Sequence, residues 1–93
     1  MDLHDALIDW DDSHEEDGNT AHIAEHGLTS EEVESALFDE DATFDVSDSS
    51  GRPIAFGMTV TGRFIVVVFE ILNLADPLII RPITAYEVPE PKE

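Results

Sequence analysis

Residues 63–70 read Arg-Phe-Ile-Val-Val-Val-Phe-Glu, and this run is the most apolar stretch of the chain. Its six central residues are all β-branched or aromatic, and they show no 3.6-residue period. A short apolar run of this composition is typical of a strand that is buried on both faces. The run is too short to cross a membrane. It therefore predicts a central strand that the rest of the chain covers.

Two further apolar runs lie on either side of the central run, at residues 54–60 and 78–86. Thr61-Gly62 separates the first run from the central one, and a loop containing Asp76-Pro77 separates the second. Short connections join antiparallel neighbours, so the three runs predict an antiparallel meander. Residues 43–46 alternate polar and apolar side chains, which predicts a half-exposed strand before the meander.

The region before these strands predicts two helices. Asn19 is a suitable N-cap for a short helix that reaches His26, and Gly27 suits the left-handed position that ends a helix. Thr29 and Glu32 have the spacing of a capping box, which predicts the start of a second helix. That helix has one apolar stripe for packing on the sheet, formed by Val33, Ala36, Leu37 and Phe38.

The order of these elements defines the fold class. Residues 6–10 predict a first strand, which precedes the two helices, the strand at 43–46 and the meander. We therefore expect an α+β domain with an antiparallel sheet of about four to five strands and two short helices before the main meander. A chain of 93 residues forms one domain, which we place at residues 1–88. The proline-rich tail at 89–93 is expected to be frayed.

Composition excludes several kinds of site and location. The chain has no cysteine, so it has neither disulfides nor thiolate metal ligands. Its N-terminus lacks the basic and apolar regions of a secretory signal, and no apolar run has the length of a membrane span. We therefore expect a cytoplasmic protein without membrane contact.

The chain is strongly acidic, with 22 Asp and Glu against 4 Lys and Arg and a formal net charge of -18. Proteins that bind RNA or DNA usually neutralise phosphates with Lys and Arg, so this surface repels nucleic acid at ordinary salt. Two explanations are open. Either the partner is a basic protein, or the chain is adapted to high internal salt, which screens the repulsion. The scattered positions of the acids favour salt adaptation.

A set of short motifs occurs in a fixed order along the chain. They are Trp10-Asp11, Asn19-x-x-His22-Ile23-x-x-His26-Gly27-Leu28-Thr29-x-Glu31-Glu32-Val33, Gly51-Arg52, Gly57-x-Thr59, Gly62-Arg63 and Ile80-Arg81-Pro82-Ile83-Thr84-Ala85. The ordered set resembles the BrnT toxins and covers most of the chain. The resemblance implies a small ribonuclease toxin with a RelE-like fold, which a ribbon-helix-helix antitoxin neutralises in a type II toxin–antitoxin system.

The chain differs from BrnT toxins in its charge. Those toxins are usually rich in Lys and Arg, and they often carry Lys where this chain has Glu25. They commonly end the last strand in Ser-Ala-Arg, where this chain has Thr84-Ala85-Tyr86. Few cations are therefore available for binding RNA.

Four residues are candidates for the RNA cleavage that this resemblance implies: His26, Arg63, Arg81 and Tyr86. Cleavage needs a group that removes the 2′-hydroxyl proton, a group that protonates the leaving 5′-oxygen, and cations for the phosphorane charge. His26 is the acid–base candidate, and Tyr86 is a candidate proton donor. Arg63 and Arg81 are expected to converge on one face of the sheet, where they would supply the positive charge.

Each candidate also has a structural alternative. Arg63 and Arg81 would pair with some of the many carboxylates, as arginines commonly do. His26 would sit at a helix C-terminus, where the helix dipole favours its charge. Tyr86 would pack at the end of its strand, which suits the amphipathic shape of tyrosine.

A metal site is a weaker alternative. His22 and His26 are four residues apart on the expected helix and share a face, and His14 lies nearby in sequence. Such a pattern arises easily by chance in a chain rich in carboxylates, so we predict no metal and no other cofactor. Trp10 would be either a binding residue at the sheet edge or, more commonly for a lone tryptophan, part of the core.

Two function classes follow from these observations. The first is a BrnT-like endoribonuclease toxin that acts on RNA and binds an antitoxin-like protein with a ribbon-helix-helix fold. The second is a catalytically silent relative that keeps the scaffold and binds a basic protein partner.

Overall fold

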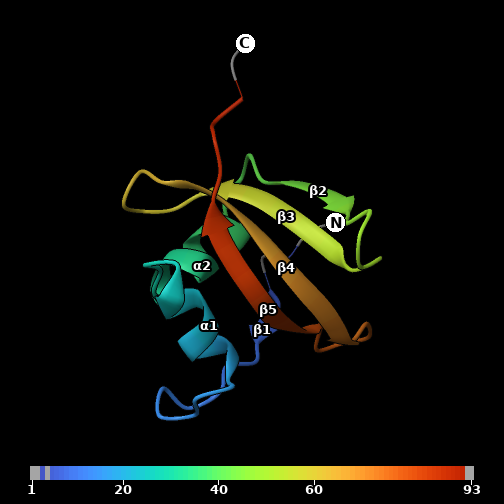
Figure 1. Ribbon diagram of the computed structural model, residues 1–93. Helices are drawn as coiled ribbons and strands as arrows, with labels where there is room; N and C mark the ends of the chain where they lie inside the picture. Colours follow the sequence, from blue (N-terminus) through green and yellow to red (C-terminus); the bar gives the residue numbers. More distant parts are fainter. Residues whose placement is uncertain (1–2, 4, 92–93) are drawn as a thin grey trace.

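The computed structural model describes residue 3 and residues 5–91, and it has an α+β fold (Figure 1). The predicted succession of one strand, two helices and four strands is confirmed. The elements in chain order are β1 (Leu7–Ile8), α1 (Asn19–Glu25), α2 (Ser30–Leu37), β2 (Thr43–Val46), β3 (Pro53–Met58), β4 (Phe64–Asn73) and β5 (Ile79–Glu87). Residues 89–91 carry no regular secondary structure, and the remainder of the tail, Lys92 and Glu93, lies outside the described residues.

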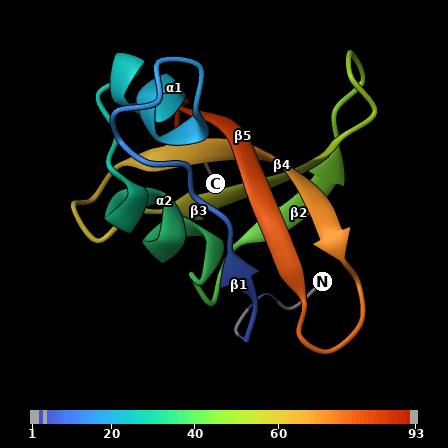
Figure 2. The same cartoon turned by 90° about the horizontal axis from the view of Figure 1, so that it is seen from below.

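The five strands form one sheet in the order β1-β5-β4-β3-β2, so β4 is the central strand as predicted. The meander of β3, β4 and β5 is antiparallel, and β2 also pairs with β3 in the antiparallel sense. The expected antiparallel sheet is confirmed except at one edge, where β1 runs parallel to β5 (Figure 2). Parallel neighbours need a long crossover, and here both helices and the other strands lie between the two.

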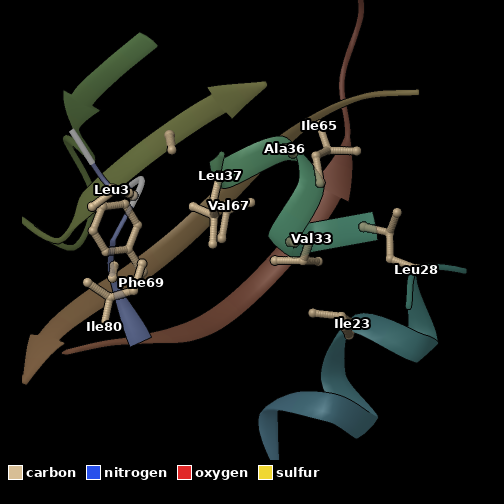
Figure 3. Close-up of a cluster of buried hydrophobic side chains, with 13 residues drawn as sticks. Leu3, Ile23, Leu28, Val33, Ala36, Leu37, Ile65, Val67, Phe69 and Ile80 are labelled. Carbon is tan, nitrogen blue, oxygen red and sulfur yellow. The ribbon is translucent and has the colours of Figure 1, made fainter. Parts of the chain in front are cut away.

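The two helices pack on one face of the sheet. Their apolar side chains meet Ile65, Val67 and Phe69 of β4, each of which is fully buried (Figure 3). The other face is less covered, since Phe64 and Val68 are only half-buried. The prediction that residues 63–70 are buried on both faces is therefore wrong. A two-layer domain of this length has no second layer of helices, so alternate residues of β4 face the helices, and on the other face of this strand Val66 alone is buried.

The predicted helix ends are largely confirmed. The capping box of Thr29 and Glu32 is present, and Gly27 has a φ of 74° after α1. The predicted N-cap of α1 is wrong, because the N-cap is Gly18 and Asn19 is the first helical residue. Asn19 is 2% exposed, and its side chain bonds other segments instead of capping its own helix.

Gly57 allows α2 to approach β3 closely. A Cβ at this position would overlap the carbonyl oxygen of Ala36 and lie 2.9 Å from its carbonyl carbon. Both are backbone atoms of α2, so no side-chain rotation relieves the overlap. The absence of a side chain at Gly57 therefore sets the distance between the helix layer and the sheet.

We expect Gly57→Ala to destabilise the domain by about 3 kcal/mol, because α2 must move away from its packing position. Urea unfolding monitored by circular dichroism measures the change. Gly62→Ala is the matched control, since a Cβ there meets nothing within 4 Å and only the φ of 84° is unfavourable. The control should cost about 1–2 kcal/mol. An equal loss in the two variants would contradict the close helix–sheet contact.

Candidate functional site

The end of α1 lies against the end of β5. His26 is the C-cap of α1, and Gly27 then turns the chain towards α2. The ring of His26 lies 5.9 Å from the ring of Tyr86, centroid to centroid, with the planes tilted by 51°. Both side chains are exposed, Tyr86 by 42%. An imidazole and a phenol are therefore adjacent at the surface.

Arg63 joins this pair from the residue before β4. Its guanidinium donates to the carbonyl oxygen of Gly27 at 2.7 Å and to Oε1 of Glu87 at 3.1 Å. Gly27 is next to His26 and Glu87 is next to Tyr86 in the sequence. The structure thus brings together three of the four predicted residues: His26, Arg63 and Tyr86. In Figure 1 the end of β5 and the loop before β4 meet beside the helices.

Glu32 connects this cluster to the start of α2. One carboxylate oxygen accepts from the backbone N–H of Thr29, and the other accepts from the hydroxyl of Thr61 at 2.6 Å. The second oxygen also lies 3.6 Å from the guanidinium of Arg63. The hydrogen bond from Thr61 is the main reason that the pKa of Glu32 is lowered, with Thr29 and Arg63 adding to it and burial opposing it.

Arg81 does not belong to this cluster. It donates to both oxygens of Asp11 and to Oδ2 of Asp9, which follow β1 at the edge of the sheet. Arg81 pairs with Glu70 in the strand register. Glu70 is seven residues after Arg63 in the sequence, so the two arginines are roughly 20 Å apart along the direction of β4. The prediction that they converge is wrong, because Arg63 directly precedes β4, whereas Arg81 lies in β5 beside the second half of β4.

The ion pair of Arg81 and Asp11 shifts the pKa values of both groups. The hydrogen bond from Arg81 is the largest cause of the lowered pKa of Asp11, and the backbone N–H of Asn19 adds to it. In turn the hydrogen bond to Asp11 raises the pKa of Arg81 above its usual value. Each partner stabilises the charged form of the other, which identifies this contact as a structural clasp.

Asn19 completes the clasp, and its role was missed from the sequence. Its amide nitrogen donates to the carbonyl oxygens of Asp9 and Pro82, and its Oδ1 accepts from the backbone N–H of Asp11. The N-terminal segment, α1 and β5 are therefore joined through one side chain. The available signal was that Asp11 and Asn19 both belong to the ordered motif set.

The remaining candidates have structural surroundings. Trp10 is half-buried against the core, and its indole N–H donates to Oε2 of Glu34 at 2.7 Å. It borders an open pocket of about 410 Å³ whose other walls are mostly acidic. His22 lies in α1 and His26 caps it. Among the described residues, no group of three or more His, Cys, Asp or Glu side chains is arranged to hold a metal ion.

No family model matches the chain, and no curated protein matches it. The BrnT resemblance therefore rests on the ordered residues themselves. Within the part of the chain that the structure describes, no helix has the length and apolarity to span a membrane.

The lowered pKa of Glu32 makes a prediction for pH dependence. Its unfolded pKa is near the ordinary value of 4.5 and its folded pKa is lower, so the charged form stabilises the fold above pH 4.5. This stabilisation is lost as the pH falls through the folded pKa. Glu32→Gln should therefore lower the free energy of unfolding at pH 6, and the difference from the native chain should shrink below pH 4.5.

Chemical denaturation at several pH values measures this difference. Glu31→Gln is the matched control, because it removes one negative charge from an exposed side chain in the same helical turn. Comparison of the two variants separates the contacts of Glu32 from a general change in net charge. A constant difference between the native chain and Glu32→Gln from pH 6 to pH 3 would contradict the proposed role.

Proposed function

We propose that the chain is a BrnT-like toxin component that cleaves RNA at the cluster of His26, Tyr86 and Arg63. The observation that supports the proposal is the pairing of the His26 and Tyr86 rings, together with the bonds of Arg63 to Gly27 and Glu87, the residues that follow them in the chain. They come from α1, β5 and the segment before β4, so only the folded chain brings them together. Imidazole, phenol and guanidinium are the groups that RNA cleavage by transesterification requires.

The proposed reaction is an internal transfer of the phosphodiester. His26 accepts the proton of the 2′-hydroxyl, whose oxygen attacks phosphorus. The bond from phosphorus to the 5′-oxygen breaks, and Tyr86 gives its proton to that oxygen. The products are a 2′,3′-cyclic phosphate and a 5′-hydroxyl. Arg63 would bind the negative charge that develops on the phosphorane oxygens.

Glu87 is the main obstacle to binding RNA at this cluster. It occupies Arg63 at 3.1 Å, and a phosphate would have to take its place. The side chain of Glu87 is 56% exposed, so the ion pair lies at the surface and salt weakens it. High salt also screens the repulsion between RNA and the net charge of -18. Both effects favour activity at high ionic strength.

Arg81 has a positioning role in this proposal. Its guanidinium is bound by Asp9 and Asp11, away from the cluster. The clasp attaches the N-terminal segment and α1 to β5, and α1 carries His26 at its end. The proposed partner is an antitoxin-like protein of the ribbon-helix-helix class, with a basic surface that complements the acidic chain.

We expect the purified protein to cleave single-stranded RNA at about 1 M potassium chloride. His26→Ala should lower the rate by at least a factor of about 100, which is the usual contribution of an acid–base group. Glu87→Gln should raise the rate at low salt, because it removes a carboxylate that competes with the RNA phosphate for Arg63. Gel analysis of the RNA products measures these rates.

The control for this assay is Arg52→Gln. Arg52 is also an exposed arginine in an ion pair, with Glu70, but it lies outside the cluster. Its removal should leave the rate unchanged. Equal cleavage by the native chain and His26→Ala would mean that the activity is a contaminant, and absence of cleavage at every ionic strength would overturn the proposal.

A second function class has its own supporting observation. Arg52, Arg63 and Arg81, the three arginines of the described residues, all form ion pairs with carboxylates. A catalytically silent module that binds a basic protein needs no free guanidinium, so it is compatible with this arrangement. A folded protein that cleaves no RNA at any salt concentration would favour this second class.

A further inference from the structure

One face of the sheet carries apolar side chains that lie outside the hydrophobic cluster between the helices and the sheet. The strand register places Phe56 of β3 opposite Val66 of β4, and Ile54 opposite Val68. Met58 and Phe64 form the next pair of the same series. We call this surface the open face, and it consists of Ile54, Phe56, Met58, Phe64, Val66 and Val68.

The open face lies on the side of the sheet opposite the helices. None of its six residues belongs to the core cluster or to the partly buried residues that pack against that cluster. Val66 in the middle is 4% exposed, whereas the other five keep intermediate exposure. The rings of Phe56 and Phe64 stack at 6.2 Å. Val66 is thus covered by its neighbours, whereas the other five side chains keep part of their surface in contact with water.

Charge decides which kind of partner suits this face. Asp45 pairs with Ile54 and so lies at the β2 side of the face. Glu70 is the next residue after Val68 on the same face of β4. Arg52 is ion-paired with Glu70. A second copy of this chain would bring a further charge of -18 against these acids, which opposes self-association. A partner with Lys or Arg beside its apolar side chains gains both attraction and burial.

We propose that the open face binds a basic amphipathic helix of a protein partner. The inference deepens the partner-binding part of the proposed function and rests on it. A helix lays its apolar stripe across a sheet face, whereas an added strand would use a sheet edge. Three to four turns, or about 10–14 residues, match the average helix. Lysines flanking the stripe would pair with Asp45 and compete with Arg52 for Glu70.

The position of the open face relates it to the candidate site. Val66, in the middle of the face, pairs with Tyr86 of β5 in the strand register. The face therefore extends to the strand that carries part of the cluster. A helix bound along it lies next to Tyr86, and this position explains how one partner would both cover the apolar surface and restrict access to the site.

A synthetic 14-residue peptide with a leucine stripe and flanking lysines is the probe for this proposal. Titrated into ¹⁵N-labelled full-length protein, it should shift the amide signals of β3 and β4 residues of the open face. The double variant Ile54→Thr with Val68→Thr should bind the peptide about tenfold more weakly, because it keeps the β-branched shape and removes apolar surface from both strands.

The matched control is Val60→Thr with Leu74→Thr. These residues are 79% and 75% exposed, and they lie in the loops at the two ends of β4, outside the open face. The control should bind as the native chain does. A thermal melt of both double variants verifies that they are folded.

Three results would overturn the proposal. The first is equal affinity of the native chain and the face variant for the peptide. The second is equal binding of a peptide with the same composition but a scrambled stripe, which would show that the interaction depends on charge alone. The third is a dimer of the free protein with the open face at its interface. The peptide titration contains no RNA, so its outcome is read separately from a failure of the cleavage assay.

Discussion

The excess of carboxylates is the constraint on which the structure depends. The chain places 22 acidic residues on a small domain, and each of the three described arginines lies between segments that would otherwise repel one another. Arg63 joins the helix layer to the ends of β4 and β5, and Arg81 joins the N-terminal segment to β5. These contacts neutralise charge where elements meet. The same contacts leave little positive charge for binding an anion.

Much of the fold could be predicted from local sequence patterns. The order of elements, the capping box at Thr29 and the left-handed Gly27 all depend on short-range physics, and the structure confirms them. The burial of β4 on both faces was wrong, because an unbroken apolar run does not reveal how many layers of helices a chain can supply. The parallel pairing of β1 depends on the whole topology, which a strand of two residues does not encode.

The candidate site was predictable only in part. His26, Arg63 and Tyr86 were identified from the BrnT resemblance and do lie together, but Arg81 occupies a separate clasp. The register of neighbouring strands decides which of their residues lie together. A register that bulges have shifted cannot be read from composition. The contact of Glu87 with Arg63 could not be predicted from the sequence, because a single carboxylate is not distinctive in a chain so rich in Asp and Glu. The open face was also not identified from the sequence, because its apolar residues alternate with core residues along the same two strands.

We infer that repulsion among carboxylates limits the stability of this domain and that the arginine ion pairs offset this repulsion locally. A thermal melt of the native chain between about 0.01 M and about 1 M potassium chloride tests it most directly, because the screening length falls from about 30 Å to about 3 Å over this range. We expect the melting temperature to rise by about 5 °C or more, which is equivalent to roughly 1 kcal/mol for a domain of this size. A melting temperature that stays constant or falls with salt would contradict it, since the acids would then already be balanced by their local contacts.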